Sequence, residues 1–159
     1  MTSDAVETMV VVFDGGRARF FAREPKRRLI FLDEIDSGLH KRTQDAVSDK
    51  DGRSFASTHS GVRHAYEPKH DKHKMEKHNF VHRLVEIMDD FYDKGCARQF
   101  AIVAPERSLG EFRALASAKL LRSIWREVPK DYTQYTLHEL QLRLQPYFES
   151  TKATVQPRT

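Results

Sequence analysis

Histidine side chains are concentrated in one part of the chain, where their spacing could bind a transition metal. Seven of the eight histidines lie between Ser37 and Arg83. His78 and His82 are four residues apart, which places two imidazoles on one side of a helix, and His73 could supply a third ligand. The glutamate that follows the first histidine in zinc proteases is absent here. We therefore expect no resident cofactor, and either solvent-exposed histidines or adventitious zinc or nickel binding.

Two carboxylates could also meet at one edge of a sheet. Asp14 follows an early apolar run and Glu106 follows a later one, so together they could hold a divalent cation. A two-metal nuclease needs several convergent carboxylates, and two are few. Asp14-Gly15-Gly16 is also typical of a tight turn. A structural turn and a metal-dependent hydrolase or nuclease site are therefore both open.

The net positive charge of the chain is confined to one segment. Between Ser37 and Arg83 there are ten Lys/Arg and six Asp/Glu, a balance of +4 that equals the formal net charge of all 159 residues. A localised basic segment is typical of a phosphate-binding surface, and a solvated polar loop is the plainer interpretation. The candidate RNA- or phosphate-binding residues are Arg53, Arg63, Lys69, Lys72, Lys74 and, outside the segment, Arg107.

Length and cysteine content restrict the class of protein. A chain of 159 residues suits one domain, expected over residues 8–148 with flexible termini at 1–7 and 149–159. A single cysteine, Cys96, excludes an internal disulfide and favours a reducing compartment. The first residues resemble no secretory signal, and the apolar run at residues 9–13 is too short to span a membrane. We therefore expect a cytoplasmic protein without a membrane partner.

The amino-terminal elements are predicted to be strands. Residues 9–13 are apolar, residues 17–21 alternate, and the glycines between them are expected to supply the positive φ of a hairpin turn. A third strand is predicted near residues 29–35. Between residues 37 and about 71 no periodicity persists and glycines and a proline are scattered, so we expect a long loop that is either functional or disordered. A helix then follows, with an apolar face from Val81 to Tyr92 and an end at Lys94-Gly95.

The remaining elements alternate between strand and helix. Residues 100–104 form a short apolar run typical of a buried parallel strand. Ser108-Leu109-Gly110-Glu111 has capping-box spacing and predicts a helix to about Leu121, beside Arg107 and Arg113, which could cradle an anion. A strand at 123–128 and a helix from a second capping box at Thr136 complete the order. This order predicts an α/β three-layer, ribonuclease-H-like fold with a mixed five-stranded sheet, order 3-2-1-4-5.

Several short motifs resemble those of one bacterial family, the host-attachment proteins. The opening from residue 12 to 20 is similar to the family's apolar strand followed by Asp-Gly-Gly-Arg-Ala-Arg. Residues 48–55, 64–68, 104–113 and 130–133 resemble four further family motifs. The family-motif residues are Asp14, Gly15, Gly16, Arg17, Asp49, Gly52, Arg53, Ser54, Phe55, Pro105, Leu109, Gly110, Lys130 and Asp131.

This resemblance implies an interaction module rather than a classical enzyme. The family resembles the middle domain of archaeal and eukaryotic peptide release factors and of Pelota, in which a long basic loop carries Gly-Gly-Gln. The segment 49–74 occupies the same place in the element order, but it contains no Gly-Gly-Gln. The resemblance therefore implies binding of RNA or the ribosome through a basic loop, without peptide release. A protein partner in host attachment and a metal-dependent hydrolase are the alternatives.

Overall fold

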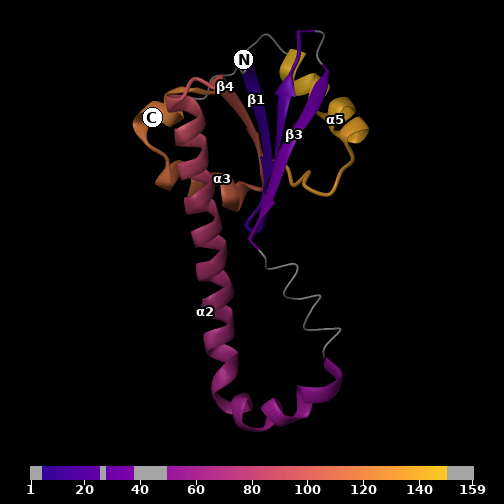
Figure 1. Ribbon diagram of the computed structural model, residues 1–159, viewed down its shortest axis with the longest axis vertical. Helices are drawn as coiled ribbons and strands as arrows, with labels where there is room; N and C mark the ends of the chain where they lie inside the picture. The colour runs from indigo at the N-terminus through magenta and orange to yellow at the C-terminus, as the bar shows by residue number, and fades with distance from the viewer. Residues whose placement is uncertain (1–4, 26–27, 38–49, 150–159) are drawn as a thin grey trace.

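The chain folds around one mixed five-stranded sheet (Figure 1). The structure, a computed structural model, describes residues 5–25, 28–37 and 50–149, with the backbone alone for residues 50–71. The strands are β1 (Val6–Phe13), β2 (Arg17–Arg23), β3 (Leu29–Asp36), β4 (Ala97–Val103) and β5 (Ile124–Val128). Their order is β3-β2-β1-β4-β5, with β1 antiparallel to β2 and parallel to β4. The predicted α/β class and strand order are confirmed.

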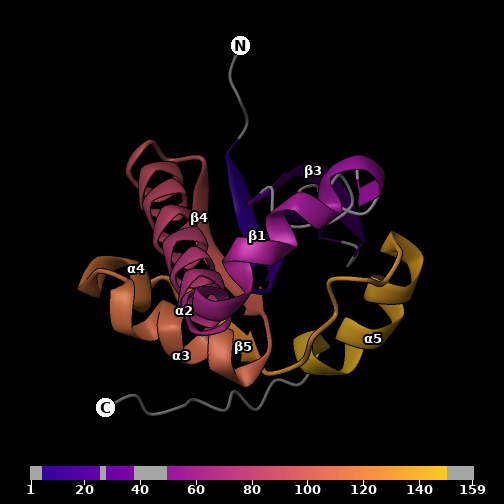
Figure 2. The ribbon, with the colours of Figure 1, turned by 90° about the horizontal axis from the view of Figure 1, so that it is seen from below.

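Helices cover both faces of the sheet. They are α2 (Lys50–Asp93), α3 (Glu106–Leu115), α4 (Ala118–Arg122) and α5 (Leu137–Glu149). Figure 2 shows α2, α3 and α4 on one side of the strands and α5 on the other. Phe13, Leu84 and Phe112 share the core on the α2 side, whereas Val12 and Leu140 belong to the core on the α5 side. Residues of β1 alternate between the two cores, which explains why its apolar run is continuous.

The segment predicted as a loop is helical from Lys50 onward. Helix α2 includes Gly52, Gly61 and Pro68, residue types that usually interrupt helices, so the expectation of a loop was wrong for residues 50–71. Hydrophobic periodicity reports a buried helix face, and Figure 1 shows the amino-terminal part of α2 reaching well beyond the sheet. A helix segment that lies beyond the sheet needs no apolar face toward it. None of the helices in the described ranges has the length and apolar character needed to cross a bilayer.

The end of α2 follows the prediction closely. Its carboxyl-terminal part supplies Phe80, Val81, Leu84 and Met88 to the core. Beyond Asp93 the backbone turns at Gly95, which has a φ of 75°. The N–H of Cys96 donates to the carbonyl of Phe91 (2.8 Å), and the N–H of Gly95 donates to that of Tyr92 (3.1 Å). Glycine tolerates this left-handed backbone, so the predicted helix end is confirmed.

Two capping boxes with the same spacing have different outcomes. At Thr136 the prediction is confirmed, since Glu139 N–H donates to Thr136 Oγ1 (3.2 Å) and Thr136 N–H donates to Glu139 Oε1 (2.9 Å). At Ser108 it was wrong, because α3 begins at Glu106 after Pro105 and Ser108 is buried within the helix. Proline favours the extended backbone that precedes a helix, so the helix begins earlier. The helix also ends at Leu115, and Ser117 caps the separate α4.

Candidate functional site

The turn between β1 and β2 is organised by a carboxylate. The N–H groups of Gly16 and Arg17 both donate to Asp14 Oδ1, at 2.8 and 2.9 Å. The backbone N–H of Asp14 donates to the carbonyl of Arg17 (3.0 Å). Neither Gly15 nor Gly16 has a positive φ, so the predicted role of the glycines in the turn was wrong. An aspartate at the first turn position thus holds the hairpin by side-chain hydrogen bonds.

The same aspartate contacts the loop that follows β5. Thr133 is 1% exposed, and its hydroxyl lies 2.8 Å from Asp131 Oδ1 and 3.3 Å from Asp14 Oδ2. The single hydroxyl proton is therefore shared between two carboxylates. Because β1 and β5 are both parallel to β4, their carboxyl ends reach the same edge of the sheet. This edge is where open α/β sheets usually place their sites.

Two arginines of β2 complete the cluster from the side of the hairpin. Arg17 Nη2 and Arg19 Nη1 both donate to the carbonyl of Thr133, at 3.1 and 3.3 Å. Arg19 Nη1 also donates to the carbonyl of Tyr135 at 2.6 Å. We call Asp14, Arg17, Arg19, Asp131 and Thr133 the turn cluster. Its internal hydrogen bonds join two segments more than 110 residues apart in the chain.

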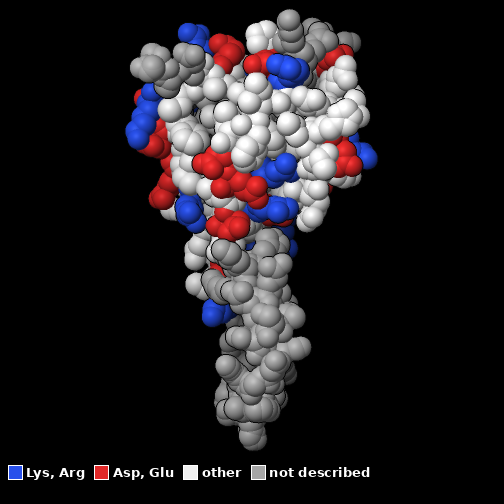
Figure 3. All heavy atoms as spheres, turned by 45° about the vertical axis from the view of Figure 1, so that its right-hand side comes forward, with Lys and Arg blue, Asp and Glu red and all other residues white. Residues whose placement is uncertain are grey.

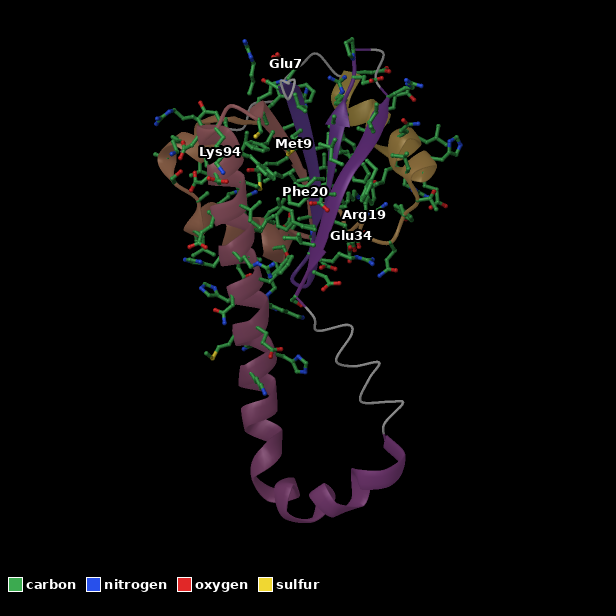
Figure 4. All side chains as sticks on the ribbon, viewed as in Figure 1. Glu7, Met9, Arg19, Phe20, Glu34 and Lys94 are labelled. Carbon is green, nitrogen blue, oxygen red and sulfur yellow. The ribbon has the colours of Figure 1, made fainter. Side chains whose placement is uncertain are left out.

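The charges of the turn cluster are partly balanced by β3. Arg17 Nη1 lies 3.8 Å from Glu34 Oε2, and Arg19 is the register partner of Glu34 (Figure 4). Burial lowers the pKa of Arg19, while the charge of Glu34 raises it and that of Arg17 lowers it. The guanidinium of Arg19 also lies over the ring of Phe21, 5.2 Å from its centroid. These contacts fix both arginines in place, which is typical of a structural role.

Helix α2 approaches the turn at Gly15. A Cβ added to Gly15 would lie 2.9 Å from Lys77 Cγ and 3.1 Å from Lys77 Cβ and Cδ. These atoms belong to the stem of the lysine rather than to its flexible end. Only a glycine therefore leaves room for the helix to pass, and the need for a small residue is one of close approach. The turn thus links the hairpin, α2 and the loop after β5.

Two of the motifs noted in the sequence therefore converge in space. Asp14 to Arg17 forms the turn, and Lys130 to Thr133 forms the loop that binds it. A family model described as "Protein required for attachment to host cells" matches residues 9–144. The chain belongs to this family. No curated protein matches the chain.

The third motif of the host-attachment family contributes a helix start rather than an anion cradle. Pro105 precedes α3, while Leu109 is buried in the core on the α2 side. Arg113 Nη2 lies 2.6 Å from Glu127 Oε1, and this hydrogen bond raises the pKa of Arg113. The guanidinium of Arg113 is thus committed to β5. Arg107 is exposed, and a Cβ at Gly110 would meet nothing within 4 Å.

The metal-binding hypotheses find little support in the described residues. Nowhere in residues 5–25, 28–37 and 72–149 do three metal-ligating side chains come together, whether around Asp14 and Glu106 or around His73, His78 and His82. The three histidines are exposed, and His82 Nδ1 lies 3.6 Å from Glu86 Oε2. Asp14 is already engaged by its turn and by Thr133. His78 and His82 remain a pair on one helix.

The predicted basic surface is only partly described. Lys72 and Lys74 are exposed on α2, and so is Lys77, which was not among the predicted residues. None of the three forms an ion pair with a carboxylate in the part of the chain that the structure describes. Residues Gly52, Arg53, Ser54, Phe55, Arg63 and Lys69 lie within α2, but their side chains are outside the described ones, and Asp49 is outside the described residues altogether.

Sequence reasoning identified some of the turn cluster but not its contacts. Asp14, Arg17 and Asp131 were noted as family-motif residues, whereas Arg19, Thr133 and Glu34 were not proposed as site residues. Arg19 lies in the same run as Arg17, so the alternation of arginines along β2 was the available signal. No pattern in the sequence indicates that Lys77 passes over Gly15.

Proposed function

We propose that this host-attachment-family protein is a non-catalytic interaction module that binds RNA, in a cytoplasmic and ribosomal setting, through exposed lysines of α2. The observation that carries the proposal is the exposure of Lys72, Lys74 and Lys77 on a helix that extends beyond the sheet. Lysines without a carboxylate partner are free to exchange counterions for phosphates. The role in host attachment that the family's name records would then depend on binding rather than on turnover.

The turn cluster supports a module rather than an enzyme. Both oxygens of Asp14 accept hydrogen bonds from the protein, and Arg17 and Arg19 donate to backbone carbonyls. A catalytic side chain needs a donor or acceptor atom that is free to contact the substrate. These groups instead hold the hairpin against the loop after β5, so the turn is structural support for the helix that passes over it.

The fold supports a relation to release-factor middle domains as part of the same proposal. Three antiparallel strands precede two parallel ones in the order β3-β2-β1-β4-β5, which is the arrangement of ribonuclease-H-like sheets. In this proposal α2 and the segment before it take the place of the release-factor loop. Without Gly-Gly-Gln the chain would contact ribosomal RNA or tRNA and leave peptidyl-tRNA intact.

Salt-dependent RNA binding tests the proposal directly. Fluorescence anisotropy with labelled single-stranded RNA should give a log-affinity against log-salt slope of about −3 for four phosphate contacts, at about 0.7 per contact. Lys72→Ala and Lys74→Ala should each flatten the slope by about 0.7. Lys94→Ala is the matched control, because Lys94 lies just past the other end of α2 and pairs with Asp90 at 3.1 Å.

Two outcomes would contradict the proposal. If the parent protein binds no RNA, or binds it without salt dependence, the phosphate-binding surface is wrong and a protein partner becomes the better explanation. If Lys94→Ala flattens the slope as much as Lys72→Ala does, binding depends on overall charge and not on the exposed part of α2. Peptide release above the rate without factor would instead favour an enzyme.

A further inference from the structure

The outer strand of the sheet exposes apolar side chains in a row. Strand β3 is the first in the sheet order and pairs with β2 alone among the described strands. Ile30, Phe31 and Leu32 are 38%, 48% and 42% exposed, in the middle of the strand. Exposed apolar edge strands are templates for pairing with another chain, and proteins usually protect them with charge or prolines. In β3 the register with β2 shifts by one residue between Phe31 and Asp33, and acidic residues follow the apolar run, but Ile30, Phe31 and Leu32 themselves carry no charge. An exposed apolar run on an edge strand indicates an interaction surface.

The exposed residues lie on both faces of the sheet. Phe31 pairs in register with Phe21 and contacts it edge to face at 5.9 Å, on the side of α5. Its neighbour Ile30 pairs with Ala22 and therefore points to the opposite face. A partner that packed on one face would cover only one of these side chains. A strand added alongside β3 would flank both, so the pattern favours pairing at the edge.

The charges of β3 identify the kind of strand that fits. Arg28, just before the strand, is exposed and basic and pairs with Glu24 at 3.1 Å. Toward the carboxyl end, Asp33 and Glu34 are exposed and acidic, and Glu34 lies 3.8 Å from Arg17. In an antiparallel pair of identical strands, the amino end of each lies opposite the carboxyl end of the other. Each Arg28 then faces the partner's acidic end while the apolar residues meet near the twofold axis.

We propose that β3 is the dimerisation edge of the protein, where a second copy pairs antiparallel with the first and extends the sheet across a twofold axis. Side chains already occupy backbone groups near the two ends of the strand. Leu29 N–H donates to Gln141 Oε1 (2.7 Å), and Glu34 N–H donates to Asp33 Oδ1 (2.8 Å). Pairing is therefore centred on Phe31, with the charged ends setting the register and direction.

Sedimentation of the full chain at rising concentration tests the proposal. We expect a dissociation constant of about 1 µM for the dimer, so the parent protein should be mostly dimeric at about 100 µM. Phe31→Asp should raise the dissociation constant at least about tenfold, because it places like charges near the axis. Leu121→Asp is the control, since Leu121 is 37% exposed on α4 and remote from β3. Unchanged circular dichroism would show that both variants are folded.

A charge exchange distinguishes this interface from any other. Arg28→Glu and Asp33→Lys should each weaken the dimer when present alone, because each variant places like charges at both ends of the pair. Mixed in equal amounts, the two variants should form a heterodimer with complementary charges at both ends. A parent that stays monomeric, a dimer insensitive to Phe31→Asp, or a mixture that stays monomeric would each overturn the proposal.

Discussion

Because α2 passes close to Gly15, the effect of Gly15→Ala on the free energy of unfolding should depend on Lys77. Two effects of Gly15→Ala oppose each other. Fewer unfolded conformations would stabilise the protein by about 0.4–1 kcal/mol, since Gly15 lacks a positive φ. The added Cβ, 2.9 Å from Lys77 Cγ, must displace a lysine stem, and overpacking of this kind costs about 1–3 kcal/mol.

The turn cannot easily move away from the helix. Asp14 holds the backbone of Gly16 and Arg17 and also contacts Thr133, so the turn is fixed from two sides. We therefore expect the overpacking to dominate, with a net loss of about 1–2 kcal/mol in the free energy of unfolding. For a chain of this size the Tm should fall by about 3–6 °C.

A second substitution should reverse most of this loss. Lys77→Ala removes the Cγ and Cδ atoms and leaves the Cβ, which would still lie 3.1 Å from the new methyl group. Gly15→Ala should then be nearly neutral, giving a coupling energy of about 1 kcal/mol or more between the two positions. Urea unfolding followed through the single tryptophan, Trp125, measures all four members of the cycle.

Gly110→Ala provides the matched control. Gly110 lies within α3, where an added Cβ meets nothing within 4 Å, so alanine should stabilise the protein by about 0.5–1 kcal/mol. The same cost for Gly15→Ala with and without Lys77 would refute the steric argument. It would show that the turn itself, and not the helix passing over it, requires glycine.

Four further predictions follow from single contacts. Thr136→Ala should lower the free energy of unfolding by about 0.5–2 kcal/mol in urea unfolding, because it removes the cap of α5. Thr133→Val should cost about 1–3 kcal/mol in the same assay, because the buried hydroxyl serves two carboxylates. Burial, with smaller contributions from neighbouring tyrosines, raises the pKa of Tyr132, so the neutral form is favoured in the folded state. Stability should fall as pH rises above about 10, the unfolded value, and continue to fall until the raised folded pKa is passed. Tyr132→Phe should remove that part of the fall in the free energy of unfolding, measured by urea unfolding at one pH below about 10 and one pH above it. Calorimetry with Zn²⁺ should show a binding heat for the parent protein that disappears when His78→Ala and His82→Ala are combined. Equal heats for the parent and the double variant would show that the two histidines do not bind the metal.

The strands could be predicted from the sequence because burial left a simple pattern on them. Met9 to Phe13 is apolar without interruption since helices cover both faces of β1, and the alternation in β2 follows from its pleat. The sheet order followed from short connections between antiparallel strands and helices between parallel ones. Helix α2 was missed over residues 50–71 because its amino-terminal part extends beyond the sheet, where helix formation requires no apolar face toward the sheet.

The site was harder to predict because the hydrogen-bond acceptors of its two arginines are backbone atoms. Arg17 and Arg19 donate to the carbonyls of Thr133 and Tyr135, and a carbonyl leaves no mark on the residue type. The capping boxes show a related limit. Thr136 and Ser108 have the same spacing to a glutamate, but Pro105 begins α3 before Ser108 can cap it.

The surface around the sheet edge shows how locally charge is arranged. Figure 3 shows acidic and basic side chains interspersed on the face above the grey segment, rather than a single block of one sign. Arg17 and Glu34 illustrate this mixture at 3.8 Å. Counts of charge along the chain predicted a basic segment, and they could not predict which of its charges neighbouring elements neutralise.

The contacts between the hairpin and the loop after β5 set the order in which parts of the protein can fold during synthesis. The β1–β2 hairpin can form soon after it leaves the ribosome, but Arg19 finds the Tyr135 carbonyl only when most of the chain has emerged. At ordinary elongation rates of 5–20 residues per second, this wait lasts about 6–24 s. Until β4 emerges, earlier within that time, the open edge of β1 that pairs with β4 exposes backbone and valine side chains to other chains. A nascent chain of this protein is therefore a natural client for chaperones that bind extended apolar segments, and slow synthesis would lengthen the exposure.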